Sequence, residues 1–451
     1  MFYGEEGGIL FTNKQLRALL VPLVIEQVLT AFMGVADTFM VANVGEAAIS
    51  GVSLVDSINM LVTYFFTALA AGGTIVCAQY IGQESIDKAN QTARQVMAAV
   101  LFLSLTFSVI LVPLRMPLLR LIFGSVESAV MDAAGVYFLV TALSYPFLGL
   151  YSTSAALYRA VGNSKRPMLV ALAADIMNIV GNAILIFGFH MGVLGAAIAT
   201  LASRVFSASV MLYYQTRPGQ SITLDKPLSY RPDMAMIRRI LRVGLPSAVE
   251  NGMFQFGKLV VQSTVSILGT TAIAAQAIVV TLESFGVMPG MAIGIGLVTV
   301  AGQCMGRGRP DEARKYMLRL TKISTLVVIG TGALVSIAAP IVTQLTGLSQ
   351  EGIRLTCYLT WFVSVLRVTI WPWAFTLPNG LRAAGDVSYT MWVSTVSMWV
   401  FRVAMSWYLC RYTPIGLWGV WFGWCTDWLV RAVCYVARFL SGRWQEKRVL
   451  D

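Results

Sequence analysis

Long apolar runs recur along this chain, and they constrain its fold more than any other feature. About twelve of them are long enough to cross a lipid bilayer, which takes roughly 20 predominantly apolar residues. Of the 451 residues, 57% are hydrophobic and only 12% are charged, whereas soluble proteins are about 25% charged. We therefore predict an all-α membrane protein with one transmembrane helix per run. The predicted spans lie near 17–41, 52–80, 93–114, 133–158, 168–189, 193–215, 240–268, 274–304, 318–346, 355–380, 388–411 and 416–440.

The basic residues test this map, because the cytoplasmic loops of membrane proteins are enriched in lysine and arginine. With the N-terminus placed in the cytoplasm, the outside segments hold only Arg115, Arg120, Arg354 and Arg411 of the 33 basic residues. The map therefore places both termini in the cytoplasm and treats the first span as uncleaved. The net charge of +11 is assigned to the loops, since no basic tract with interleaved aromatic residues indicates a nucleic-acid partner.

The two halves of the sequence repeat one another. A shift of 224 residues aligns Pro22 with Pro246 and Glu26 with Glu250. The same shift aligns Gly45 with Gly269, Gln79 with Gln303, Gly82 with Gly306 and Gly192 with Gly416. An even number of spans in each half returns the chain to its starting side, so the repeats are parallel, as in many transporters.

This repeat predicts two lobes around a central cavity. The N-lobe is expected at 1–215 and the C-lobe at 240–451. Between them, residues 216–239 contain prolines and mixed charges and are predicted to form a cytoplasmic linker that ends in an amphipathic helix.

The first predicted span contains two acids, Glu26 and Asp37, eleven residues apart. At about 100° per residue, they fall on one face of a helix. A carboxylate at the centre of a membrane-spanning helix costs about 2.5–3.5 kcal/mol on insertion scales. That face is therefore predicted to look into protein or into a water-filled cavity.

Further polar residues gather in the predicted spans of the N-terminal half. They are Asp56 and Asn59, then Asp175, Asn178 and Asn182 at helical spacing, then Thr200 and Arg204. Carboxylate, amide and hydroxyl oxygens can hold a hard monovalent cation, and a carboxylate can bind and release a proton. The alternative is that these groups hydrogen-bond across helices and fix their packing. For Asp37 we favour the functional role, and for Asp56, near the start of its span, an interfacial one. For the two asparagines both stay open.

Several motifs in this order resemble the multidrug and toxic compound extrusion (MATE) family, within the multidrug/oligosaccharidyl-lipid/polysaccharide flippase superfamily. They are Pro22…Asp37…Gly45, Gln79-x-x-Gly82, Arg159-Ala-x-Gly-Asn163 and Gly192-x-x-Gly195 with the following Thr200. The resemblance covers the whole chain. It implies a transporter that exports amphipathic, often cationic, organic compounds in exchange for H⁺ or Na⁺.

The resemblance also implies which residues form the cation-coupling site. By the match these are Asp37, Asn178, Asn182, the carbonyl of Ala196, and Thr200. Similar prokaryotic members have aspartate at position 182, so the site of this chain has one fewer carboxylate, and Asp37 is the principal titrating group. Asp175, one turn before Asn178, is a candidate to compensate. If the coupling ion is Na⁺, its candidate ligands are Asp37, Asn178, Asn182 and Thr200.

The C-terminal half departs from this pattern, because Val261 stands where the first half has Asp37. The ion site is therefore not duplicated. The in-span acids of this half are Glu250, Glu283 and Asp427, with Lys258, Arg367, Arg402 and Arg431 as basic residues. The candidates for substrate contact are Glu26, Glu250, Glu283 and Arg204, with helix–helix hydrogen bonding as the alternative. Asp427 and Arg431, at i and i+4, are predicted to form a structural pair.

All eleven tryptophans lie between Trp361 and Trp444. Trp421, Trp424 and Trp428 share one face of the last predicted span. Tryptophan is enriched at membrane interfaces, which is one account of this stripe. A stacking surface for aromatic cations is the other.

We therefore predict a monomeric multi-pass antiporter of the inner membrane that transports small molecules and needs no cofactor. An enzyme is not expected, since the chain contains no HExxH, GxSxG or phosphate-binding glycine loop with its lysine. The alternative function is a flippase for lipids or lipid-linked saccharides, which related superfamily members translocate. The basic in-span residues Arg204, Arg367 and Arg402 favour that alternative, and the span count argues against it.

Overall fold

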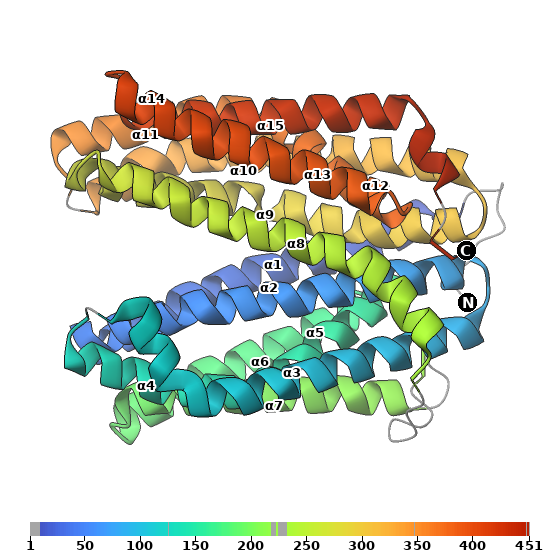
Figure 1. The fold of residues 1–451 in the computed structure, drawn as a ribbon, viewed down its shortest axis with the longest axis horizontal. Helices are drawn as coiled ribbons and strands as arrows, with labels where there is room; N and C mark the ends of the chain where they lie inside the picture. The colour runs from blue at the N-terminus through green and yellow to red at the C-terminus, as the bar shows by residue number, and fades with distance from the viewer. Residues whose placement is uncertain are drawn as a thin grey trace. The chain divides into compact units, whose positions relative to one another are not determined.

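The computed structural model describes residues 10–124, 126–217, 222–223, 232–346, 348–447 and 449–450 (Figure 1). Within these ranges the chain is nearly all helical and forms no strand. It divides into two compact units, one over Thr12–Ala248 and the other over Val249–Asp451, which also takes in residues 10 and 11. The predicted all-α fold is confirmed.

The first unit is built from seven α-helices and one π-helical segment. They are α1 (Asn13–Ala42), α2 (Glu46–Gly82), α3 (Ile86–Phe123), α4 (Ser128–Leu143), α5 (Tyr145–Ala160), α6 (Lys165–Asn182), η1 (Ala183–Gly188) and α7 (Gly192–Thr216). A capping box begins α1, where the Gln15 backbone N–H donates to Thr12 Oγ1 at 3.3 Å and the Thr12 N–H donates to Gln15 Oε1 at 2.8 Å.

The second unit consists of the end of α8 (Met234–Ser266) and all later elements. These are α9 (Thr270–Gly306), α10 (Pro310–Gln344), α11 (Gln350–Trp371), η2 (Pro372–Thr376), α12 (Leu377–Ala383), α13 (Val387–Ser397), η3 (Met398–Met405), α14 (Ser406–Tyr412), α15 (Leu417–Leu440) and the short η4 (Arg443–Glu446). Two of the π-helical segments, η2 and η3, lie within these helices.

Each predicted span corresponds to one helix or to one run of consecutive helical segments. Eight helices in the described part of the chain are long and apolar enough to cross a membrane. The count rises to nine when α4 and α5, which meet at a bend of 49°, are taken as one span. The remaining predicted spans match α8, the α13–η3–α14 run and α15.

The structure moves some predicted boundaries. The helix α8 begins at Met234, inside the segment 216–239, and continues without a break into the next span. Most of the rest of that segment, residues 218–221 and 224–231, lies outside the described residues. The helix α2 begins at Glu46, so Asp56 lies about three turns into it rather than near its start.

The repeat is visible in backbone conformation as well as in sequence. Gly192 precedes α7 with φ of +56°, and its counterpart Gly416 precedes α15 with φ of +55°. Residues with a Cβ rarely adopt this left-handed conformation, so glycine is favoured at both positions.

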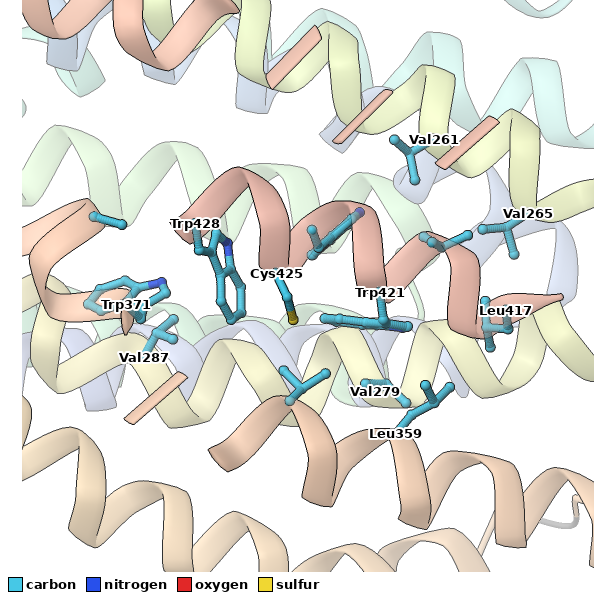
Figure 2. Packing of buried hydrophobic residues seen from close by; sticks show 14 of the residues in the cluster. Val261, Val265, Val279, Val287, Leu359, Trp371, Leu417, Trp421, Cys425 and Trp428 are labelled. Atoms are coloured by element: carbon cyan, nitrogen blue, oxygen red, sulfur yellow. The ribbon is translucent and has the colours of Figure 1, made fainter. Parts of the chain in front are cut away.

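Tryptophans of α15 form the centre of the apolar core in the second unit (Figure 2). Trp421 is fully buried, and its Nε1 donates to Oε1 of Gln276 on α9 at 2.8 Å. Trp424 and Trp428 are 7% and 2% exposed. The stripe is therefore core rather than the interface belt or the stacking surface that the sequence suggested, because its neighbours on α9 and α11 cover it.

Candidate functional site

The five residues of the predicted cation site come from three helices of the first unit. Asp37 lies near the end of α1, Asn178 and Asn182 lie one turn apart on α6, and Ala196 and Thr200 lie one turn apart on α7. The helix α6 packs against both α1 and α7. Residues far apart in sequence can therefore meet on one side of α6.

Hydrogen bonds join these residues into one chain. Asn182 Nδ2 donates to Asp37 Oδ1 at 2.6 Å and to Asn178 Oδ1 at 3.0 Å. Asn178 Nδ2 donates to Thr200 Oγ1 at 3.3 Å, and Thr200 Oγ1 donates to the Ala196 carbonyl at 3.0 Å. The structure thus brings together every residue that the family resemblance assigned to the site, whereas Asp175, the candidate to compensate for Asn182, is not part of this chain of hydrogen bonds.

The Asn178 amide can face Asp37 in two ways. With its nitrogen toward Asp37, it donates to Oδ1 at 2.8 Å, which suits a charged carboxylate. With its oxygen in that place, two acceptor oxygens oppose each other unless Asp37 carries a proton to donate. The orientation of this amide is therefore linked to the protonation of Asp37.

The cluster offers the oxygen ligands that a hard cation prefers. Asn178 and Asn182 are 2% and 1% exposed, and Asn182 Oδ1 is buried without a hydrogen-bond partner in the described part of the chain. A buried acceptor without a partner costs about 1–3 kcal/mol, so a cation at this oxygen would be favoured. The π-helical segment η1 begins directly after Asn182, and such segments occur often at functional sites.

The electrostatic surroundings of the cluster are negative. Asp37 lies within electrostatic range of two other carboxylates, Asp56 and Asp175, and of one guanidinium, that of Arg204. Asp175 makes no hydrogen bond to the cluster, and its buried Oδ2 has no hydrogen-bond partner among the described residues. Three carboxylates beside a single guanidinium attract a cation.

A second polar network lies on the neighbouring helices, and sequence reasoning marked Asp56, Asn59 and Arg204 but missed their partners. Tyr145 OH donates to Asn59 Oδ1 at 2.7 Å, and Asn59 Nδ2 donates to Asp56 Oδ1 at 3.2 Å. Arg204 Nη1 donates to Ser144 Oγ at 2.6 Å. Ser144 occupies the bend between α4 and α5, so Arg204 ties α7 to this bend. Neither Ser144 nor Tyr145 carries a charge or motif that would have marked it.

Two of the candidate substrate-binding acids form ion pairs that the repeat duplicates. Glu26 on α1 pairs with Arg159 on α5. Glu250 on α8 pairs with Arg382 on α12 at 2.5 Å and also accepts from Ser394 Oγ at 2.5 Å. Both arginines open the repeated Arg-Ala-x-Gly turn. The glutamates and the turns each recur in both halves of the sequence, but the sequence does not pair one with the other.

The third candidate acid, Glu283 on α9, is also paired. Arg367 on α11 is fully buried, and its Nη1 donates to Glu283 Oε2 at 2.7 Å. The predicted Asp427–Arg431 pair forms at 2.7 Å on α15, and Arg402 on η3 approaches the same carboxylate at 2.7 Å. Every in-span acid of the second unit that the sequence marked is therefore engaged by an arginine.

The sequence profile of the MatE family matches the chain twice, over residues 22–184 and 246–408. Both ends of the second match lie 224 residues beyond those of the first, which is the shift of the internal repeat. A probable multidrug resistance protein NorM from Thermotoga maritima is 27% identical, with 97% of this chain and 94% of the relative aligned. The uncharacterized transporter YisQ from Bacillus subtilis is 26% identical over 94% of each chain.

A solved structure has the same fold. It is described as the outward-facing conformation of a multidrug resistance MATE family transporter of the MOP superfamily. Its TM-score to this chain is 0.87, with 21% identity over 95% of both chains. The two profile matches cover most of the chain, and they are offset by the shift of the internal repeat. The chain thus belongs to the MatE family, the multidrug and toxic compound extrusion transporters, and is an integral multi-pass membrane protein.

Proposed function

We propose that this protein is an antiporter that exports amphipathic, often cationic, organic compounds in exchange for H⁺ or Na⁺ bound at Asp37. The observation that carries this proposal is the hydrogen-bonded cluster of Asp37, Asn182, Asn178 and Thr200 in the first unit. The multidrug resistance name of the Thermotoga relative supports the substrate class.

Either coupling ion can act through the same atoms. A proton on Asp37 removes its charge and lets it donate to Asn178 Oδ1. A sodium ion would instead take the Asp37 carboxylate, the two amide oxygens, the Ala196 carbonyl and Thr200 Oγ1 as ligands. Both events neutralise a carboxylate within a membrane-spanning helix, which changes the cost of rearranging α1 by a few kcal/mol.

We propose that this change drives alternating access of the rocker-switch type. A ligand shifts a two-state equilibrium by as much as its binding differs between the states. Ion binding on the outer side would displace the substrate, and ion release in the cytoplasm would prepare the site for new substrate. The cycle requires an inner-membrane location, and the distribution of basic residues supports cytoplasmic termini.

We further propose that Glu26, Glu250 and Glu283 position helices rather than bind substrate. Each already accepts a charged hydrogen bond from an arginine. A cationic substrate would have to replace that arginine, which would leave a buried guanidinium without its partner at a cost of about 3–5 kcal/mol. Of the four candidates for substrate contact, Arg204 has no carboxylate within ion-pair distance in the described part of the chain, and its hydrogen-bond partner, Ser144, is uncharged.

The proposal is tested by efflux of a fluorescent organic cation from proteoliposomes under a pH gradient alone and under a Na⁺ gradient alone. We expect Asp37→Asn to abolish ion-driven efflux while the purified protein keeps its elution volume and melting temperature. Asp132→Asn, at an exposed position on α4, is the matched control and should transport like the wild type. Full ion-driven efflux by Asp37→Asn would refute the assignment.

A further inference from the structure

Three basic side chains of the second unit surround one aromatic ring. Lys258 Nζ lies 4.9 Å from the centroid of the Phe254 ring, Arg402 Cζ lies 5.0 Å from it, and Arg431 Cζ lies 5.7 Å from it. These residues come from α8, η3 and α15. Any two of these cationic groups are therefore no farther apart than the sum of their distances to the ring centroid. They lie inside a predominantly apolar unit.

One carboxylate serves two of the three cations. Asp427 accepts from Arg402 Nε at 2.9 Å, from Arg431 Nε at 2.7 Å and from Ser397 Oγ at 2.6 Å. It is fully buried and engaged on both oxygens. Lys258 has no carboxylate within ion-pair distance among the described residues. The cluster therefore holds an excess of positive charge, which is costly in a low-dielectric interior.

An unpaired hydrogen-bond donor, Trp424 Nε1, lies in the same cluster. Arg402 Cζ sits 4.5 Å from the centroid of the Trp424 ring. Trp424 is 7% exposed, yet its Nε1 makes no hydrogen bond within the described part of the chain. Arg402 is 2% exposed, and its Nη2 lies 2.7 Å from Asp427 Oδ2. Lys258, on α8, is half-buried. Buried donors beside excess positive charge are what an acid group binds.

The repeat relates residues of this cluster to residues of the cation site, and the two sets have opposite polarity. The shift of 224 residues takes Asn178 to Arg402 and Thr200 to Trp424, while Val261 replaces aspartate. The contacts correspond as well, because Asn178 touches Thr200 in the first unit and Arg402 touches Trp424 in the second. Where Asn178 and Thr200 offer oxygen atoms in the first unit, Arg402 and Trp424 offer only donors in the second.

We propose that the second unit contains an anion-binding site formed by Lys258, Arg402 and Trp424. Its ligand is the acid group of an amphipathic organic molecule, whose carboxylate, sulfonate or phosphate would lie between Lys258 Nζ and the free Nε1 donor of Trp424, beside the positive charge of Arg402. The apolar part of the molecule packs against Phe254. A soluble organic acid and the headgroup of an anionic lipid share this chemistry.

Two dyes of opposite charge test the site. Dansyl-taurine carries a sulfonate, and the dansyl amide of aminoethyl-trimethylammonium carries a quaternary amine on a linker of the same length. All eleven tryptophans belong to residues 361–444 of the second unit, so energy transfer from tryptophan to dansyl reports binding near this unit. The protein is used at full length in nanodiscs of phosphatidylcholine.

We expect saturable energy transfer with dansyl-taurine, and at least about tenfold weaker binding after Lys258→Met, because a close charge pair is lost. Lys258→Arg should restore binding. Lys322→Met, at an exposed lysine of α10, is the matched control and should bind like the wild type. Lys258→Met should leave binding of the cationic dye unchanged. A Lys258→Met variant that binds dansyl-taurine normally, or that loses both dyes to the same extent, would overturn the proposal.

Two further measurements separate related explanations. Asp37→Asn should bind dansyl-taurine normally, so the anion site can be tested whether or not Asp37 couples transport. Nanodiscs that contain phosphatidylglycerol identify the source of the ligand. If this lipid competes with dansyl-taurine and Lys258→Met abolishes the competition, the site binds a lipid headgroup. If dansyl-taurine binding is unchanged by the lipid, the site binds a soluble organic acid.

Discussion

Asn182 donates hydrogen bonds to both Asp37 and Asn178, while its own Oδ1 stays buried without a partner within the described residues. An amide at this position contributes an oxygen without adding a charge. A proton needs only the carboxylate of Asp37, whereas a sodium ion gains affinity from each additional negative ligand. The choice of coupling ion therefore depends on this residue more directly than on the others in the cluster.

We predict that Asn182→Asp makes transport more dependent on sodium. Two carboxylates at 2.6 Å, the present separation of Asn182 Nδ2 and Asp37 Oδ1, repel each other unless a cation or a shared proton lies between them. We expect the Na⁺ concentration for half-maximal efflux to fall by about tenfold, which corresponds to about 1.4 kcal/mol. Efflux is measured in proteoliposomes at a fixed pH with increasing Na⁺.

Asn182→Ala serves as the control for this prediction, because it removes the amide without adding charge. It should lower efflux and leave the Na⁺ dependence flat. An Asn182→Asp variant with the Na⁺ dependence of the wild type would show that position 182 does not contact the ion.

At the scale of helices, close packing of α9 against α11 depends on a glycine. A Cβ on Gly286 would lie 2.1 Å from Arg367 Nη1 and 2.5 Å from its Cζ. Arg367 cannot move aside freely, because it is fully buried and bonded to both Glu283 and Ser364. Glycine at 286 therefore leaves the space that the guanidinium occupies.

We predict that Gly286→Ala separates Arg367 from Glu283 and lowers the free energy of unfolding. Breaking a buried ion pair costs about 3–5 kcal/mol. Gly330→Ala on α10 is the matched control, since a Cβ there meets nothing within 4 Å and should stabilise the helix by about 0.5–1 kcal/mol. Thermal unfolding in detergent compares the two, and equal melting temperatures would contradict the packing argument.

The order of the helices and the repeat could be predicted from sequence because both follow from local patterns, apolar length and a fixed shift. The partners of charged groups could not. Glu26 and Arg159 lie on different helices, and spacing along one helix says nothing about which helix it meets. The tryptophan stripe of α15 shows the same limit, because its spacing gave one face but not whether lipid or protein covers it.

The resemblance to a family supplied what spacing could not at the candidate site. The helical spacing of Asn178 and Asn182 placed them on one face of a span. The resemblance grouped them with Asp37 and Thr200, which their polarity within spans had already marked, and added Ala196. The nearby Ser144 escaped both, because it is a neutral residue at a bend whose partner, Arg204, lies on another helix.

At the scale of the whole molecule, the two units carry opposite charge in corresponding places. Asp37 in the first unit lies near two further carboxylates and one guanidinium. In the second unit Glu250, Glu283 and Asp427 are all held by arginines. On this arrangement one carboxylate, Asp37, is free to exchange a single positive charge in each transport cycle.

We predict that proton-coupled export of a monovalent organic cation is electroneutral, because one charge leaves as one enters. A dication exported against one proton would move a net charge outward, which an inside-negative potential opposes by about 2.3 kcal/mol per 100 mV. The test sets potassium–valinomycin potentials across proteoliposomes at a constant pH gradient. Monovalent efflux should not respond to the potential, whereas efflux of the dication should slow. Asp175→Asn should leave both results unchanged, and a monovalent efflux that follows the potential would require a second coupling ion.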